Sequence, residues 1–439
     1  MPPTQRDLFR LFVPLALSGI FFPLARPLIN AALARTANPE QALAAFGIAL
    51  SVTMPLISPL FSLRQVTTAL AKDQDMRRRI RNLSLLLGSI STALLLIVSI
   101  PQVYNQTVVQ WMAIPDTLTT IGPSVLLALC FSPLLGVGRG YYQGILVRYN
   151  KAGPIGTGAL AYLLGIAITL FIGITWIPIE GAILAAVASV IGQIFYILCV
   201  GLPSLPIIHH QIPDRSDDIL EEHRTNRHLI HFYLPLAIST GLMSIIEPAL
   251  QTGMARSAQP TLSLAAYAIA VSLGWLARTP LWNAQQIVIS HATDLASYYQ
   301  TRKFMFTLGF AMVLFMAILG APGISDPVFT HLMGVQGDMK QLAISGFRWL
   351  IPLIFFQALR SLYHGVLTCH NLTRHVQYAS MIRTVVIFPA LIAGVSFLRV
   401  EGIYIVIWAN LLSELAETIW LHRAVKKIDW NKIATQKTQ

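Results

Sequence analysis

The sequence Phe12-Val13-Pro14-Leu15-Ala16-Leu17-Ser18 opens a long apolar segment, and it returns 221 residues later as Tyr233-Leu234-Pro235-Leu236-Ala237-Ile238-Ser239. The correspondence extends over residues 11–73 and 232–294, which share 20 identities in 63 positions without a gap, several of them prolines. Further along the chain, Glu180-Gly181 matches Glu401-Gly402 at the same offset. The chain is therefore a tandem duplication.

The composition of the 439-residue chain is that of a protein whose solvent is largely lipid. Only 11% of the residues are charged, whereas a soluble domain has about a quarter. Hydrophobic residues make up 55%, and the mean hydropathy is +0.62. The formal net charge of +12 comes from short basic clusters between apolar segments, as the positive-inside rule requires, so we expect no nucleic-acid partner. The three cysteines show neither paired nor metal-ligand spacing.

Twelve segments are long enough to cross a bilayer, which takes about 20 mostly apolar residues. They are residues 8–34, 42–70, 82–103, 121–147, 154–175, 181–203, 229–255, 263–291, 305–322, 341–368, 380–398 and 402–422. We therefore expect an all-α polytopic membrane protein of 12 transmembrane helices in two six-helix lobes. Because each copy has an even number of spans, the copies are parallel and their pseudo-two-fold axis is expected along the membrane normal.

Basic residues indicate which loops face the cytoplasm. Residues 72–81 after the second span carry five Lys or Arg, whereas residues 104–120 and 176–180 carry none. The positive-inside rule then places both termini in the cytoplasm, in a multi-pass protein of the inner or plasma membrane. We divide the chain into an N-lobe (1–203), a polar cytoplasmic linker (204–228) and a C-lobe (229–439) with a short cytoplasmic tail.

Arg26 and Glu247 are equivalent in the two copies, and each lies inside a span immediately before a proline. An ionisable residue within a span is costly and by default suggests a functional site. A proline bends a helix, and a bend is tolerated only against protein or a water-filled cavity. If the lobes face a cleft, Arg26 and Glu247 approach it from opposite sides, either to bind ligands or to form a salt bridge. Asn30 and Gln251, one turn further, extend this polar stripe.

Arginines outnumber acids within the spans, and this surplus favours an anionic substrate because a guanidinium binds carboxylate or phosphate in a bidentate manner. Arg64, Arg139 and Arg360 are the further candidates for substrate binding. Arg139 and Arg360 are repeat equivalents, and they either line the cavity or anchor a helix end.

Glu414 and Glu417 are three residues apart and share one face of the last span. They relay protons, bind a cation or pair with Arg383 in the neighbouring span. We favour the structural pairing.

No catalytic motif is present. The chain has no phosphate-binding loop, no Gly-x-Ser-x-Gly, no His-Glu-x-x-His and no Cys-x-x-Cys. We expect no enzymatic activity, no cofactor and no metal, with Na⁺ or H⁺ as the only coupling ion if transport is coupled. We also expect a monomer in the lipid bilayer with a small-molecule anionic substrate.

The arrangement of two parallel six-span halves, each opening on a long proline-containing helix, resembles the MOP flippase superfamily, which contains the MATE multidrug exporters. Trp111-Met112-Ala113-Ile114-Pro115 and Leu332-Met333-Gly334-Val335 resemble its short signature after the third and ninth spans. The resemblance implies the MATE-like fold, a substrate cleft lined by spans one, two, seven and eight, and alternating access.

Three short motifs are similar to the progressive ankylosis (ANK) family of exporters within that superfamily. They are Phe12-Val13-Pro14-Leu15, Arg26-Pro27-Leu28-Ile29-Asn30 and Ile212-Pro213-Asp214-Arg215-Ser216. The family implies export of citrate, nucleotide or pyrophosphate. One departure is that the family has its Arg-Pro motif in the second half, where this chain has Glu247-Pro248. An acid in the seventh helix resembles the coupling-ion carboxylate of some MATE exporters.

We therefore predict a secondary transporter that exports a small organic or phosphate-bearing anion. The alternatives are a MATE-like cation antiporter coupled to H⁺ or Na⁺ and a flippase for lipid-linked precursors. A membrane-embedded enzyme or a receptor is the third class, but the longest polar stretch is a linker of about 25 residues, which leaves little chain for a soluble site.

Overall fold

In the computed structural model, almost every described residue lies in a helix. The structure describes residues 4–10, 12, 21–149, 151, 153–177, 179–214, 225–370, 372–398, 400–428 and 430. The first repeat contains α2 (Phe21–Leu33), α3 (Pro39–Ile57), η1 (Ser58–Ser62), α4 (Leu63–Leu70), α5 (Gln74–Val98), α6 (Pro101–Tyr104), η2 (Asn105–Val109), α7 (Gln110–Met112), α8 (Asp116–Thr119), α9 (Ile121–Leu129), α10 (Ser132–Arg148), α11 (Gly153–Trp176) and α12 (Gly181–His210). The second contains α13 (Asn226–Ser244), α14 (Ile246–Ala255), α15 (Pro260–His291), α16 (Leu295–Leu319), α17 (Ser325–Pro327), η4 (Val328–Leu332), α18 (Gly337–Trp349), α19 (Ile351–Cys369), α20 (Thr373–Phe397) and α21 (Gly402–Lys426).

The duplication is visible in the helix boundaries. α5 and α16 begin and end at equivalent residues, and each is capped by an equivalent aspartate. The carboxylate of Asp73 accepts a hydrogen bond from the backbone N–H of Met76, and that of Asp294 accepts one from Ser297. An aspartate at this position satisfies a backbone donor that the helix itself leaves free. The identical spacing of the two copies thus follows from identical local signals.

The second span of each repeat shows where the copies differ. α15 is one continuous helix of 32 residues, whereas its counterpart is divided into α3, the 3₁₀ segment η1 and α4. Both copies carry the equivalent prolines Pro59 and Pro280. The proline therefore does not by itself decide whether the helix is interrupted.

Ten helical segments of the described ranges are long and apolar enough to cross a membrane. Four of them, in α5, α11, α16 and α20, bury only 22–28% of their most apolar window, whereas the segments that begin at Pro39, Pro260 and Gly402 bury 61%. Apolar side chains that the protein leaves uncovered require lipid, so these four helices form the periphery. The two other expected spans are the first of each repeat. Residues 13–20 of the first lie outside the described residues.

The seventh span is divided where its proline predicts. α13 ends at Ser244 and α14 begins at Ile246, two residues before Pro248. The ring of a proline clashes with the preceding turn and removes one of its hydrogen bonds. In the first span, α2 contains Pro27 and remains helical across it.

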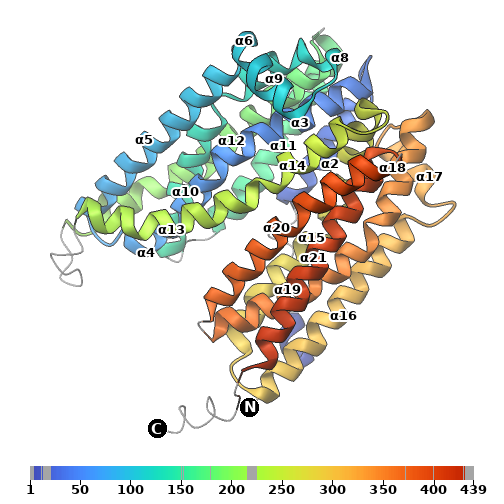
Figure 1. Cartoon of the computed structure of the whole chain (residues 1–439). Coiled ribbons are helices and arrows are strands. Elements are labelled where there is room, and N and C mark those ends of the chain that lie inside the picture. Colours follow the sequence, from blue (N-terminus) through green and yellow to red (C-terminus); the bar gives the residue numbers. More distant parts are fainter. Residues whose placement is uncertain are drawn as a thin grey trace. The chain divides into compact units, whose positions relative to one another are not determined.

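The chain forms two compact units, which we call unit 1 (Met1–Ala31 with Ser257–Gln439) and unit 2 (Ala32–Arg256). The first helix of each repeat is therefore exchanged. In unit 1 the Gln5 amide donates to the backbone carbonyl of Gln300 at 2.8 Å. In unit 2 the Arg79 guanidinium donates to the side chain of Asn226 at 3.1 Å, and Figure 1 shows α13 beside α4. The predicted lobes at 1–203 and 229–439 follow the sequence duplication. The two compact units differ from these lobes because the first helix of each repeat belongs to the unit formed by the other repeat.

The predicted linker at 204–228 is partly helical. Residues 204–210 continue α12, and α13 begins at Asn226. Residues 215–224 lie outside the described residues.

Two equivalent glycines permit close contact between helices, and we predict that alanine at either one destabilises its unit. A Cβ at Gly144 would lie 2.5 Å from that of Thr67, and one at Gly365 would lie 2.6 Å from that of Val288. Overpacking of this kind costs about 1–3 kcal/mol. The thermal unfolding temperature of Gly144→Ala and Gly365→Ala should therefore fall, whereas Gly156→Ala, with open space around it, should match the wild type. Equal stability of all three variants would contradict the packing described.

Candidate functional site: a buried charge cluster in unit 1

Six ionisable side chains from four helices meet in the apolar interior of unit 1. We call them the charge cluster: Arg278 on α15, Arg360 and His364 on α19, Arg383 on α20, and Glu414 and Glu417 on α21. The two glutamate side chains are 1% and 0% exposed. An ion buried to this extent loses several kcal/mol of hydration and persists only among opposite charges and hydrogen bonds.

Arg383 joins the two carboxylates. Its Nη2 donates to Oε1 of Glu414 at 2.9 Å, and its Nη1 donates to Oε2 of Glu417 at 3.5 Å. This contact confirms the pairing that we expected from the sequence. Nη2 also donates to the side-chain oxygen of Asn410 at 3.0 Å, so α20 is attached to α21 through three side chains.

Each glutamate has a second arginine of its own. The Arg278 Nη2 donates to Oε1 of Glu414 at 2.6 Å, and the Arg360 Nε donates to Oε1 of Glu417 at 2.9 Å. The His364 ring nitrogen lies 3.4 Å from the same oxygen of Glu417. Three guanidiniums therefore face two carboxylates, which leaves one surplus positive charge when the imidazole is neutral.

The guanidiniums differ in their access. Arg383 is 8% exposed, whereas Arg278 and Arg360 are 17% and 14% exposed. Arg278 also lies over the ring of Trp275, with its Cζ 5.5 Å from the centroid, and reaches the Gln357 side-chain oxygen at 3.3 Å. Arg278 and Arg360 are thus the two most exposed guanidiniums of the cluster.

Sequence reasoning missed two members of the charge cluster, Arg278 and His364, together with their neighbour Asn410, although a signal was present. Asn410, Glu414 and Glu417 follow the i, i+4, i+7 spacing that puts side chains on one face of a helix, and Arg360 and His364 are four apart. Arg278 was visible as a basic residue within a span. The pairing of Arg278 with Glu414 depends on how α15 packs against α21, and the sequence of α15 alone does not predict this packing.

Unit 2 has the same arrangement with other chemistry. Arg139 is the counterpart of Arg360, and its Cζ lies 5.3 Å from the ring centroid of Tyr196, the counterpart of Glu417. Gln143, in place of His364, donates a hydrogen bond to the Tyr196 hydroxyl. Gln193 stands in place of Glu414. The contacts between α10 and α12 are thus retained without carboxylates.

Asn30 and Gln251 are buried at equivalent helix contacts. The Asn30 amide donates to the backbone carbonyl of Ala268 at 2.8 Å, within unit 1. In unit 2 the Gln251 amide nitrogen lies against Gly47, the counterpart of Ala268, 3.7 Å from where a Cβ would stand. Each side chain thus lies where the exchanged first helix meets the second helix of its unit. Their role in substrate binding stays a prediction.

The other predicted residues are distributed over both units. Arg26 is half-buried in unit 1, and Glu247 is half-buried in unit 2, where its Oε1 accepts a 3.4 Å hydrogen bond from Gln251. Arg64 is exposed, and its backbone nitrogen lies 3.5 Å from where a Cβ of Gly140 would stand. Of the predicted binding residues, Arg360 is the one that belongs to the charge cluster.

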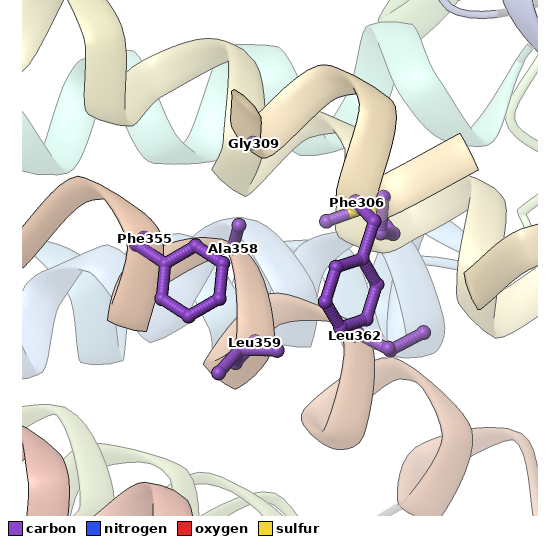
Figure 2. A pocket seen from close by; sticks show the side chains of 7 residues that line it. Phe306, Gly309, Phe355, Ala358, Leu359 and Leu362 are labelled. Carbon is purple, nitrogen blue, oxygen red and sulfur yellow. The ribbon is translucent and has the colours of Figure 1, made fainter. Parts of the chain in front are cut away.

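A small apolar pocket between α16 and α19 offers no alternative site. Figure 2 shows Phe306 and Gly309 facing Phe355, Ala358 and Leu359 across it. Its accessible volume of about 10 Å³ is about the least that admits a single water molecule. None of its lining side chains carries a charge or a strong hydrogen-bonding group, so it does not suit an ion.

Comparison with known proteins decides the family. A family model described as progressive ankylosis protein (ANKH) matches residues 3–271. The chain belongs to the progressive ankylosis protein family. This membership confirms the resemblance seen in its short sequence motifs.

Solved structures confirm the MATE-like fold. An inward-facing multidrug resistance MATE family transporter of the MOP superfamily has a TM-score of 0.76 at 16% identity, with 96% of each chain covered. A MOP superfamily transporter from Pyrococcus furiosus has a TM-score of 0.67 at 15% identity, with 97% of each covered. The lipid II flippase MurJ has 0.66 at 13% identity, with 96% of this chain and 89% of that one covered. This member of the ANKH family is thus an integral, multi-pass, all-α membrane protein.

Removal of Arg383 should destabilise unit 1 strongly. Arg383→Gln leaves both glutamates with fewer counter-charges, and removing one partner of a buried ion pair costs about 3–5 kcal/mol. The matched control is Arg374→Gln on the same helix, where the side chain is exposed. Thermal unfolding of the purified protein should show a large loss for Arg383→Gln and little change for the control. Similar unfolding temperatures would mean that the cluster does not hold the four helices together.

Proposed function

We propose that this member of the ANKH family is a secondary transporter that moves a small organic or phosphate-bearing anion, of the citrate, nucleotide or pyrophosphate type, out of the cytoplasm. The single observation that carries the anionic substrate is the charge cluster, in which three guanidiniums face two carboxylates. A surplus positive charge in an apolar environment is stabilised by an anion far more than it would be in water. Family membership supports the same substrate class.

Arg278 and Arg360 are the groups that contact the substrate in this proposal. They are more exposed than Arg383, and a guanidinium presents donors in a fork that fits carboxylate and phosphate oxygens. Arg26, Arg64 and Arg139 remain the further candidates for steps in which the anion moves past the other helices.

Alternating access is the expected transport cycle. MATE family transporters of the same fold have been solved in an inward-facing and in an outward-facing conformation. The exchanged first helices give each compact unit a covalent connection to the other. Rocking of repeats about a fixed site is the usual mechanism of transporters built from internal repeats.

A MATE-like cation antiporter is the second candidate because of one residue. Glu247 is half-buried within the seventh span, and in unit 2 its Oε1 accepts a hydrogen bond from the neutral side chain of Gln251 at 3.4 Å. A half-buried carboxylate that is bonded to a neutral amide suits Na⁺ or H⁺. Glu247 is accordingly our candidate for ion coupling in either kind of transporter.

Transport assays distinguish the two candidates. Reconstituted wild-type protein should take up labelled citrate or pyrophosphate into inside-out vesicles, and Arg360→Gln should reduce the rate at least about tenfold, the effect of losing one hydrogen bond to a charged group. Arg360→Lys keeps the positive charge and the neutralisation of Glu417 but loses the forked donors of the guanidinium. Partial transport by this variant would show that the loss in Arg360→Gln comes from weaker substrate binding and not from misfolding. Arg374→Gln is the control.

Uptake of a cationic dye that is abolished by Glu247→Gln and insensitive to Arg360 would instead establish the cation antiporter. Absence of both activities would leave the lipid-precursor flippase as the function to test.

The direction of transport depends on orientation. The basic residues of the stretch 72–81, which follows α4 and includes the first turns of α5, support a cytoplasmic location for this connection and for both termini. A cysteine at the exposed position of Asp75 should be labelled by an impermeant maleimide only after permeabilisation, whereas one at Gln106 should be labelled on intact cells. The opposite pattern would reverse the direction.

A further inference from the structure

The carboxylate of Glu414 is held at one oxygen only. Its Oε1 accepts from Arg278 at 2.6 Å and from Arg383 at 2.9 Å, whereas its Oε2 is buried with no hydrogen-bond partner among the described residues. Glu417 is different, because Arg360 and His364 contact one oxygen and Arg383 contacts the other. A buried acceptor without a donor costs about 1–3 kcal/mol, so the ionised form of Glu414 is held by fewer donors than that of Glu417.

The partner of Glu414 can be released without becoming isolated. Arg278 already contacts the Gln357 oxygen at 3.3 Å and the face of Trp275 at 5.5 Å. It is the most exposed guanidinium of the cluster, at 17%. When Glu414 is neutral, Arg278 therefore keeps two weaker contacts and has lost its closest ion-pair partner.

The other charged groups of the cluster are positive or already paired. Arg278 approaches from α15, Arg360 and His364 from α19 and Arg383 from α20, while Glu417 lies on the same helix and is paired. With both glutamates ionised the cluster carries one surplus positive charge, and with Glu414 protonated it carries two. Protonation and anion binding thus stabilise each other, and such coupling is reciprocal.

We propose that Glu414 carries a proton on Oε2 during the transport cycle and that this proton makes Arg278 available to the substrate anion. The second half of the proposal rests on the proposed function. In the empty, ionised state the Glu414 carboxylate occupies the place of a substrate carboxylate or phosphate on Arg278. Protonation cancels its charge, the anion takes over the guanidinium, and release of the anion restores the pair when the proton leaves.

The other repeat carries an amide at the position equivalent to Glu414. Gln193, the counterpart of Glu414 in unit 2, is a native amide that donates to Ser132 Oγ at 3.3 Å. Glu414→Gln therefore imitates the protonated carboxyl group without changing its shape. The double variant Arg278→Gln with Glu414→Gln leaves no ion without its partner and serves if the single variant is unstable.

Infrared difference spectroscopy tests the proton site without reference to transport. The protein in lipid vesicles is compared between neutral and mildly acidic buffer. We expect the carbonyl band of a protonated carboxylic acid in the wild type and in Glu401→Gln, which changes the acid that precedes α21. Other acids, including Glu247, absorb in the same region, so the decisive signal is the component of the band that Glu414→Gln removes. This component should be lost in Glu414→Gln and in the double variant and kept in Glu401→Gln. A spectrum of Glu414→Gln that equals that of the wild type overturns the proposal.

Citrate binding at one neutral pH tests the link to the anion. Glu414→Gln should bind citrate at least about fivefold more tightly than the wild type, the lower end of typical coupling between two sites. The double variant, which lacks Arg278, should lose this gain. If the infrared band depends on Glu414 but citrate affinity is the same in all variants, the proton site stands and its link to the anion is overturned. If no variant binds or transports any anion, the proposed function itself fails while the infrared result still decides the proton site.

Discussion

Two carboxylates on α21 cannot remain ionised in the apolar interior of a membrane protein unless cations lie within hydrogen-bonding distance. Glu414 and Glu417 meet this constraint by drawing arginines from α15, α19 and α20. The cluster costs hydration energy, and replacing a buried ion cluster by hydrophobic residues of similar volume is often neutral or stabilising. We therefore infer that the cluster serves for the charges it presents rather than for the stability it adds.

The comparison between the repeats supports this view. Unit 2 keeps the contact between Arg139 and the α12 residue Tyr196 and places amides where unit 1 has His364 and Glu414. The same backbone therefore packs with or without buried acids. We infer that the two units differ in function. The buried ion-pair cluster lies in unit 1, whereas Glu247, the half-buried acid of the seventh span, lies in unit 2.

Much of the fold could be predicted because it rests on local signals that the chain states twice. The caps at Asp73 and Asp294, the spans and the break before Pro248 all follow from residues close in sequence. The exchange of the first helices could not be predicted, since two copies of one pattern fit either repeat equally well. The same limit applies to the site. The pairing of Arg383 with α21 was predicted from neighbouring spans, whereas the contact of Arg278 with Glu414 joins helices 136 residues apart in sequence.

The measurement that tests the central claim most directly is the thermal unfolding of the purified protein with pyrophosphate or with tetraphenylphosphonium, at equal ionic strength. A ligand that binds only the folded state raises the unfolding temperature. The account predicts that pyrophosphate raises it in the wild type and in Arg374→Gln but not in Arg360→Gln. A shift with tetraphenylphosphonium alone would contradict an anion site and would place the binding chemistry on the carboxylates.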